Sequence, residues 1–219
     1  MTVLDDLTAA LREFILDTGA APAFADTALS RYLQLALADY SRRRPYLALG
    51  SFNLVPGQAA YPLPAGFLAF VTEMRPQSYD FDAGDSPWFV SSTPPLVASA
   101  PGLVIGAVSG CSFTARVVGG QALLSPVPSF AAVLPFSYYA QHTWDTVPPA
   151  DHHALVLFAA SLAYRALAGD RALLSRYRVG KGGVEVDASR AADQLLALAR
   201  EARDQYDALV TAAPFGLPG

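Results

Sequence analysis

Apolar residues recur at every third or fourth position in the first part of the chain, which predicts two amphipathic helices there. Thr2 is the expected N-cap of the first helix, with Asp5 completing a weak capping box, and Gly19 and Pro22 are expected to end it. Asp26 is the expected cap of the second helix. The predicted buried positions are Val3, Leu4, Leu7, Leu11, Phe14 and Ile15, then Leu29, Tyr32, Leu33, Ala36, Leu37 and Tyr40.

The last part of the chain shows the same helical spacing. A strongly apolar helix is predicted from Asp151 to about Ala168, closed by Gly169, and a short one at Arg171–Tyr177. A glycine-rich loop then leads to a final helix between about Ala188 and Val210. The positions of this helix that are expected to face a partner helix are Ala192, Leu195, Leu196, Ala199, Tyr206 and Leu209.

The middle of the chain has a different pattern, with short apolar runs separated by Pro and Gly turn signals. Such spacing is typical of a small β-sandwich or barrel. Gly119-Gly120, between two of the runs, predicts a hairpin. The predicted strands are Ser51–Val55, Phe67–Met74, Trp88–Ser91, Leu103–Ala107, Ser112–Val118, Gln121–Leu124 and Val133–Tyr139.

These patterns together predict the α+β fold class. We expect residues 1–49 and 141–219 to pack as one helical bundle, with an extended tail at the end of the second segment. Residues 50–140 are expected to form a central inserted antiparallel β-sandwich or barrel-like subdomain.

Composition narrows the possible functions. Hydrophobic residues make up 53% of the 219 residues and charged residues 16%, which excludes a mostly disordered chain. A formal net charge of -4 argues against a generic nucleic-acid binder. Charge is scarce between 50 and 140, so we expect faces of this segment to be covered by other protein surfaces. Its charged residues are Glu73, Arg75, Asp80, Asp82, Asp85 and Arg116.

The single cysteine and the first residues bear on compartment. Cys111 excludes an internal disulfide and a multi-cysteine metal site, and we expect it to be a plain buried thiol in a strand. The N-terminal residues lack the basic start and apolar run of a signal peptide. The most apolar helix candidate, Ala154–Tyr164, is shorter than the roughly 20 residues that span a bilayer. We therefore expect a protein that is made in a cytoplasm and stays soluble.

Residues capable of catalysis or metal binding are few. His152 and His153 are adjacent, so they point in different directions from a helix and cannot easily share one metal ion. With Asp151 beside them and His142 upstream, they are expected to be polar residues at a helix start. The sequence predicts no catalytic residue, no metal site and no cofactor.

Three other motifs match functional patterns only in part. In Gly180-Lys181-Gly182-Gly183, Gly182 stands where a phosphate loop needs Ser or Thr, and a helix precedes the loop, which favours a flexible connection. Ser109 lacks the G-x-S-x-G context of a hydrolase nucleophile. Asp80, Asp82 and Asp85 lack the later glutamate of a calcium loop.

Two basic clusters are candidate interaction sites. Arg42, Arg43 and Arg44 at the end of the second helix are interpreted as dipole partners or salt-bridge donors, with contact to a nucleic-acid backbone as the alternative. The second cluster surrounds the glycine-rich loop and consists of Arg171, Arg176, Arg178 and Lys181. The sequence does not decide which surfaces these groups meet.

Two stretches carry a resemblance to a known family. Tyr61-Pro62-Leu63-Pro64-Ala65-Gly66-Phe67-Leu68, in the segment Phe52–Leu68, follows the pattern Y-x-L-P-x-x-F-L. Farther on, Val133–Ala140 leads through Trp144–Pro148 to the alanine-rich helix Ala154–Ala168. Over most of its length the chain resembles the head-to-tail connector, or adaptor, proteins of tailed bacteriophages, including the tubular A-type proteins of short-tailed phages.

The resemblance implies a structural protein of the virion neck with no enzymatic activity. It implies a homo-oligomeric ring, usually a dodecamer, that docks on the portal protein and on tail or neck proteins. DNA would pass through its lumen without sequence-specific binding, and a terminal segment would reach onto a neighbour. The candidate partner-binding residues are then Arg42, Arg43, Arg44, Arg176, Arg178, Lys181, Phe215 and Leu217.

Two alternatives stay open on the sequence. Another neck or tail subunit, such as a tail-tube, baseplate or head-completion protein, would share the same assembly chemistry, although tube proteins carry more strand and less helix. A small-ligand-binding or hydrolytic α+β domain would instead need a concave pocket with converging polar groups. The aromatic residues that could line such a pocket are Trp88, Phe89, Tyr138, Tyr139 and Trp144.

Overall fold

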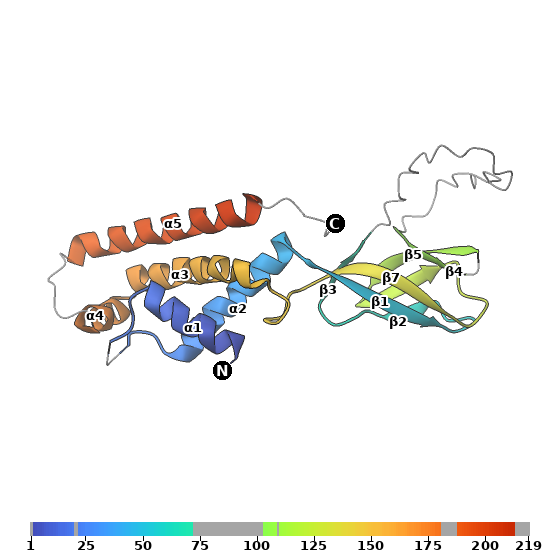
Figure 1. The fold of residues 1–219 in the computed structure, drawn as a ribbon, viewed down its shortest axis with the longest axis horizontal. Coiled ribbons are helices and arrows are strands. Elements are labelled where there is room, and N and C mark those ends of the chain that lie inside the picture. Colours follow the sequence, from blue (N-terminus) through green and yellow to red (C-terminus); the bar gives the residue numbers. More distant parts are fainter. Residues whose placement is uncertain (1, 20–21, 72–102, 109, 181–187, 213–219) are drawn as a thin grey trace. The chain divides into compact units, whose positions relative to one another are not determined.

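The computed structural model describes residues 2–19, 22–71, 103–108, 110–180 and 188–212 (Figure 1). The chain divides into two compact units, the first formed by residues 1–46 with 141–219 and the second by residues 47–140. The elements in chain order are α1 (Val3–Phe14), α2 (Asp26–Arg43), β1 (Tyr46–Leu54), β2 (Ala60–Pro62), β3 (Phe67–Phe70), β4 (Leu103–Val108), β5 (Cys111–Val118), β6 (Gln121–Ser125), β7 (Ala132–Ala140), the 3-10 turn η1 (Pro149–Asp151), α3 (His152–Gly169), α4 (Arg171–Gly180) and α5 (Ala188–Ala212).

α3 is the central helix of the first unit, and α1, α2, α4 and α5 pack against it (Figure 1). Its sequence is apolar on nearly every side, a pattern typical of a helix that is enclosed by protein rather than lying at the surface. Buried residues run almost without interruption from Ala154 to Leu167. The buried hydroxyl of Ser161 donates to the Phe158 carbonyl at 2.7 Å, so it costs little to bury.

α5 packs lengthwise on α3 (Figure 1). Burial of Leu195, Ala199 and Tyr206 confirms that part of the predicted helix face, whereas Leu196 and Leu209 were wrong and are 38% and 46% exposed. The buried face is turned relative to the predicted one, because Ala191, Ala202 and Val210 take inner positions that were assigned to Leu196 and Leu209. The buried stripe is Ala191, Leu195, Ala199, Ala202, Tyr206 and Val210, at the three-four spacing of helix-on-helix packing.

α1 begins and ends with two recognised capping arrangements. The Thr2 hydroxyl accepts from the Asp5 N–H at 3.3 Å and the Asp5 carboxylate accepts from the Thr2 N–H at 2.8 Å, which confirms the predicted capping box. The helix ends at Phe14, before the predicted Gly19. Leu16 takes a left-handed conformation, with φ of 58°, and the N–H groups of residues 16 and 17 bond back to residues 13 and 12. This Schellman-type turn ends the helix without a glycine.

The connection from α1 to α2 is fastened by Arg12 and Asp17. The buried Asp17 carboxylate accepts from the backbone N–H groups of residues 23 and 24, at 2.7 and 3.1 Å, and from Arg12 at 3.1 Å. Asp26 was wrongly predicted as the cap of α2: Ala25 occupies that position, and the Asp26 carboxylate accepts from Arg12 at 2.6 Å instead. The Asp26 carboxylate, which the sequence pattern assigned to the backbone N–H groups of α2, forms an ion pair with Arg12 across the connection instead.

The second unit contains two open sheets built from antiparallel strand pairs, in the orders β1-β7-β3 and β2-β6-β5-β4. With the helices of the first unit, they confirm the predicted α+β class. Both sheets contribute to one apolar cluster, whose buried residues are Phe52, Leu54, Tyr61, Phe70, Ile105, Phe113, Ala115, Ala122, Leu124, Leu134, Phe136, Tyr138 and Ala140.

The predicted strands from Leu103 onward are all present, within one residue at each end. β1 begins earlier than predicted, at Tyr46, and β3 ends at Phe70, whereas the predicted strand Trp88–Ser91 lies outside the described residues. β2 was missed because it is three residues long and contains Pro62, which reads as a turn signal. Pro62 is tolerated there because β2 is an edge strand with a ladder on one side only.

The predicted hairpin at Gly119-Gly120 joins β5 to β6. Val118 pairs with Gln121, and both glycines have positive φ, 58° and 77°, as a two-residue hairpin turn of this type requires. Cys111 was predicted to be a buried thiol, and that was wrong: it is exposed. Its position at the turn end of β5 leaves the side chain in solvent, although buried Phe113 follows two residues later.

Candidate functional site

Charged and phenolic side chains gather where the C-terminal end of α2, the start of α3 and the C-terminal end of α5 come together (Figure 1). We call this group the polar junction. Its members are Asp39, Tyr40, Arg43, Arg44, Asp151, Arg203, Tyr206 and Asp207. It links three helices that are far apart in the sequence, so it holds the end of the first unit in one arrangement.

Arg44 bonds to the end of α5. Its Nε donates to the Val210 carbonyl at 3.0 Å and its Nη2 donates to the Leu209 carbonyl, while Nη1 lies 3.3 Å from Asp151. The last carbonyls of a helix lack partners within the helix and carry partial negative charge. A planar cation with several fixed donors can satisfy two of them at once and still pair with a carboxylate. Arg44 therefore acts as a cap supplied by another helix.

Arg43 and Arg203 connect α2 to α5 through two shared carboxylates. Arg43 lies 3.0 Å from Asp39 and 2.7 Å from Asp207, and Arg203 lies 3.3 Å from Asp207. Both guanidinium groups also stand 5.3 Å from the centre of the Tyr206 ring. Rings and carboxylates on several sides restrict the arginine rotamers, so this network costs less side-chain entropy on formation than an isolated surface pair.

Two buried tyrosines complete the junction. Tyr40 donates its hydroxyl proton to Asp151 at 2.6 Å, and Tyr206 donates to Asp39 at 2.8 Å. Burial, and then the hydrogen bond to Asp151, raise the pKa of Tyr40 to about 12. Burial and the bond to Asp39 likewise raise the pKa of Tyr206. Both phenols are therefore protonated and uncharged at neutral pH. Each acts as a hydrogen-bond donor that links two helices.

His142 fastens the chain next to the junction. Its backbone N–H donates to the Ser41 hydroxyl at 3.0 Å, its Nε2 lies 2.9 Å from the Arg44 carbonyl, and its Nδ1 lies 3.1 Å from the Thr146 carbonyl. The ring also contacts Tyr40, with centroids 5.1 Å apart. These contacts tie the segment after β7 to the segment after α2. The sequence pattern predicted a polar residue at a helix start and not this role, since Ser41 and Arg44 lie about a hundred positions away.

The predicted partner-binding residues fall into three groups. Arg43 and Arg44 are engaged within the chain, as above. Arg42 and Arg176 are exposed and make no ion pair with any residue that the structure describes. Arg178 lies in α4, and Lys181, Phe215 and Leu217 lie outside the described residues. Arg42 is therefore the member of its cluster that remains available to a partner.

The histidines at the start of α3 lie where the sequence placed them, in the first turn of that helix. Nε2 of His152 is buried without a hydrogen-bond partner, and the ring of His153 stands edge-on to Phe14, with centroids 6.2 Å apart. Within the described ranges, no three His, Cys, Asp or Glu side chains come close enough together to hold a metal ion. The acidic residues 80, 82 and 85 and most of the glycine-rich loop lie outside those ranges.

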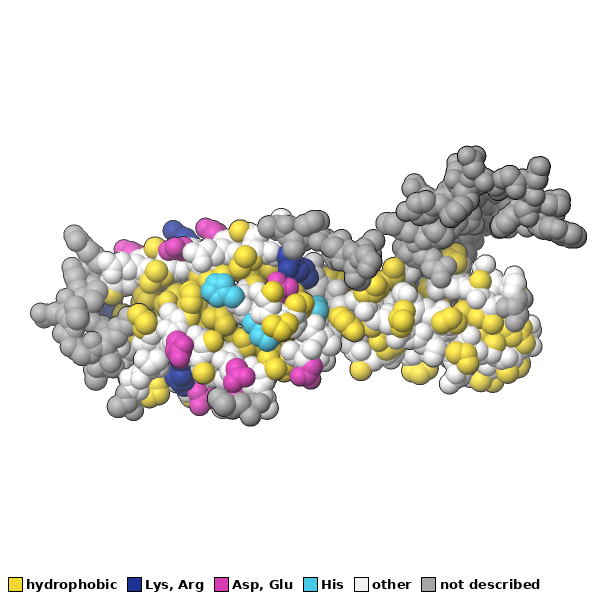
Figure 2. Space-filling model, viewed as in Figure 1, with side chains coloured by type: hydrophobic (Ala, Val, Ile, Leu, Met, Phe, Trp, Pro, Cys, Tyr) yellow, Lys and Arg dark blue, Asp and Glu magenta, His cyan; other side chains and the backbone are white. Residues whose placement is uncertain are grey.

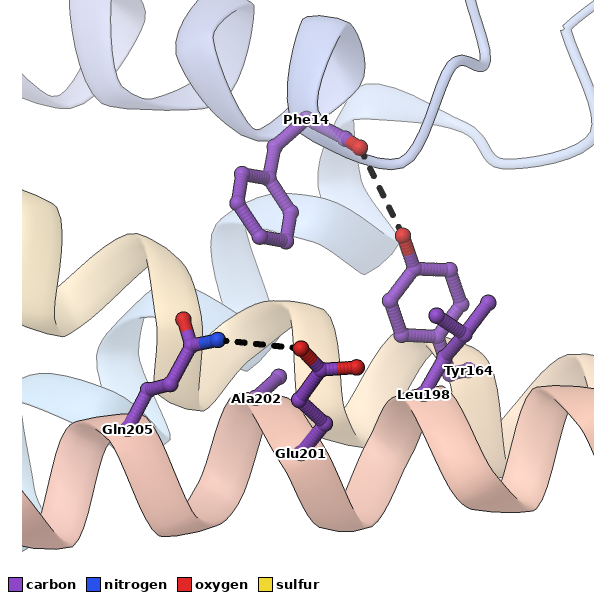
Figure 3. Close-up of a pocket in the computed structure, with 6 residues that line it drawn as sticks. All are labelled: Phe14, Tyr164, Leu198, Glu201, Ala202 and Gln205. Atoms are coloured by element: carbon purple, nitrogen blue, oxygen red, sulfur yellow. Dashed lines mark hydrogen bonds between the residues drawn. The ribbon is translucent and has the colours of Figure 1, made fainter.

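A small open pocket lies between the end of α1 and α5, with Tyr164 of α3 also lining it (Figure 3). Its volume is about 140 Å³, below the roughly 300–1,000 Å³ of most ligand sites. Tyr164 donates to the Phe14 carbonyl at 3.4 Å and Gln205 donates to Glu201 at 3.3 Å, so its polar groups bond to each other. Of the aromatic residues predicted for a pocket, Tyr138 and Trp144 belong to two separate apolar clusters.

The two units differ sharply in surface charge. In Figure 2, acidic and basic side chains are spread over the helical unit, and none is seen over the described part of the second unit. Among residues 47–71, 103–108 and 110–140 the one charged side chain is Arg116. Exposed apolar residues are frequent there instead, among them Leu47, Leu49, Val104, Val117, Val118, Val127 and Val133. No described helix is long and apolar enough to cross a membrane.

Engaged arginines, a junction that bonds to itself and an apolar, almost uncharged second unit are features of a structural protein that works through its surfaces. A protein-family model described as SU10 adaptor protein matches residues 1–214. The chain belongs to this family of bacteriophage structural adaptors, which confirms the resemblance found in the sequence. No curated protein matches the chain significantly.

Proposed function

We propose that this adaptor forms a homo-oligomeric ring in the virion neck, between the portal protein and the tail, and that DNA passes through the lumen. The observation that carries the proposal is the family match over residues 1–214, which is nearly the whole chain. The single charge of the described second unit supports assembly, because about a quarter to a third of the surface residues of a free soluble domain are charged.

The net charge of the chain supports the passage of DNA. A basic lumen would bind phosphates and retain DNA, since each neutralised phosphate adds affinity through counterion release. A formal net charge of -4 favours a channel that DNA traverses without being held. Recognition of base sequence has no role in this proposal.

Docking onto portal and tail proteins is assigned to the predicted partner-binding residues. Arg42 and Arg176 are exposed and suit acidic surfaces of a neighbouring ring. Arg178, Lys181, Phe215 and Leu217 are proposed as further contacts on the basis of sequence. Arg43 and Arg44 are proposed to contribute indirectly, by holding the end of α5 from which the C-terminal segment starts.

The test is quantitative mass spectrometry of density-purified particles, with the portal protein in the same particles as internal standard. A ratio near one adaptor per portal subunit, or about a dozen copies per particle, is expected for a ring of portal-like symmetry. Absence from particles would overturn the proposal. A ratio many times higher would assign the chain to a tail-tube subunit, because a tube stacks many rings.

A further inference from the structure

β1 lacks a strand partner along one side. In the sheet that the described residues form, it is hydrogen-bonded to β7 alone. Its nine residues, Tyr46–Leu54, contain neither a charged residue nor a proline. Natural edge strands are normally protected by lysines, prolines, bulges or short length, because their free N–H and C=O groups pair readily with other strands. A long, uncharged edge is therefore expected to be covered in the assembled state.

The side chains of β1 are buried on one side of the strand and exposed on the other. On its inner side, Phe52 and Leu54 are buried, and a Cβ added at Gly50 would stand 2.8 Å from the Phe136 ring. On its outer side, Leu49 is 83% exposed and Leu47 is 45% exposed. The strand is thus firmly packed against its own core while it presents leucines to solvent. A leucine of such exposure contributes almost nothing to the stability of the isolated chain.

β4 is a second edge of the same character, in the other sheet. Its six residues, Leu103–Val108, include no charged residue, and Val104 is 45% exposed. In the described part of the chain its ladder partner is β5 alone. A ring needs two different, complementary surfaces on every subunit, since each copy meets one neighbour on each side. The second unit supplies such a pair of surfaces.

We propose that β1 of one copy pairs with β4 of a second copy, so that a sheet continues across the boundary between neighbouring subunits. The absence of charge on both strands favours a second copy as the partner. An acidic protein or DNA would find no complementary charge on either strand, whereas another copy of this unit is equally apolar. Main-chain hydrogen bonds would supply affinity, and leucine and valine side chains would supply contact area. The inference rests on the proposed ring and names the contact that closes it.

The experiment uses three full-length variants and light scattering after size-exclusion chromatography over a range of concentrations. Leu49→Lys disables the β1 edge, and Val104→Lys disables the β4 edge. Val127→Lys is the matched control, because Val127 is 51% exposed, lies in the same unit and belongs to no strand. We expect the wild-type chain and the control to form oligomers, and each edge variant to lose at least tenfold in assembly while its melting temperature stays unchanged.

Mixing the two edge variants gives the sharper test. Each retains one working edge, so an equimolar mixture should form dimers that cannot grow further. Amide hydrogen exchange should show protection of residues 46–54 on assembly of the wild-type chain. Monomers in the mixture, unchanged oligomers of either variant, or a wild-type chain that stays monomeric would each overturn the pairing. A dozen copies of Leu49→Lys per particle would overturn it while leaving the proposed ring intact, and absence of the wild-type chain from particles would overturn the ring itself.

Discussion

Nε of Arg44 lies 3.0 Å from the carbonyl oxygen of Val210, so the C-cap residue of α2 also caps α5. The basic run at the end of α2 was interpreted as dipole partners or salt-bridge donors, and Arg43 and Arg44 are salt-bridge donors. Arg44 also donates to the end of α5, 166 positions away, and pairs with Asp151 at the start of α3. Arg44 thus links the end of α2, where it lies, to the end of α5 and the start of α3.

Replacing Arg44 should destabilise the helical unit. Arg44→Ala leaves the Leu209 and Val210 carbonyls without their donor and the partly buried Asp151 without its cation, and we expect a loss of about 3 kcal/mol in the free energy of unfolding. Urea unfolding measures the loss. Arg42→Ala is the control, since Arg42 is exposed and its removal should change stability by about 0.5 kcal/mol or less. Equal effects of the two changes would contradict the capping role.

The two carboxylates that bind Arg12 should differ in their contribution to the free energy of unfolding. Asp17 is 5% exposed and also accepts from two backbone N–H groups, whereas the side chain of Asp26 is 76% exposed. Asp17→Ala should cost about 3 kcal/mol, because it strands buried donors, and Asp26→Ala less than about 1 kcal/mol. Thermal or urea unfolding of the pair tests this. A larger effect from Asp26 would contradict the assignment.

Stability should fall in alkaline solution as buried tyrosines lose their protons. The pKa of Tyr40 is 10.0 unfolded and about 12 in the folded chain. The folded state therefore binds the hydroxyl proton of Tyr40 more tightly than the unfolded state does. The resulting contribution to the free energy of unfolding is complete below pH 10 and disappears as the pH rises to about 12. The shift corresponds to about 3 kcal/mol.

Unfolding free energy measured from pH 9 to 12 tests the contribution of Tyr40. Tyr40→Phe removes the ionisable group, so its stability should decline less steeply over this window than that of the wild-type chain. Tyr164→Phe is a second case, because burial also raises the pKa of Tyr164 to about 12. Parallel curves for wild-type chain and variants would rule out the linkage.

The exposed thiol of Cys111 should react in the native protein. A disulfide reagent such as DTNB is expected to modify one thiol per chain at a rate close to that of a small peptide thiol, without prior unfolding. Cys111→Ser provides the blank. Modification that waits for denaturant would show the thiol to be buried after all.

The C-terminal segment should serve docking and not folding. Deleting Ala212–Gly219 leaves both carbonyls that Arg44 binds, so the melting temperature should stay nearly unchanged while incorporation into particles is lost. Deleting from Leu209 onward is the control, since it removes those carbonyls and should lower the melting temperature. A large fall in melting temperature for the shorter deletion would count against a pure docking role.

The functional site was less predictable than the elements that build it. Arg42, Arg43 and Arg44 stood out as a basic run, but nothing local separates them. Tertiary contacts make Arg43 and Arg44 internal links and leave Arg42 exposed. The acidic partners Asp151 and Asp207 carry no pattern of their own, because their roles arise from helices that meet only in the folded chain.

The sequence by itself determined the order of the helices and of the described strands other than β2, the Thr2–Asp5 capping box, the Gly119-Gly120 hairpin and the family resemblance. These depend on neighbours within a few residues, where spacing and backbone preference suffice. Only the tertiary structure decided which face of α5 is buried, that Asp26 pairs with Arg12, that Cys111 is exposed and that β1 pairs with β7 alone among the described strands. Burial and partner choice are set by contacts between distant segments, and short-range patterns carry no information about them.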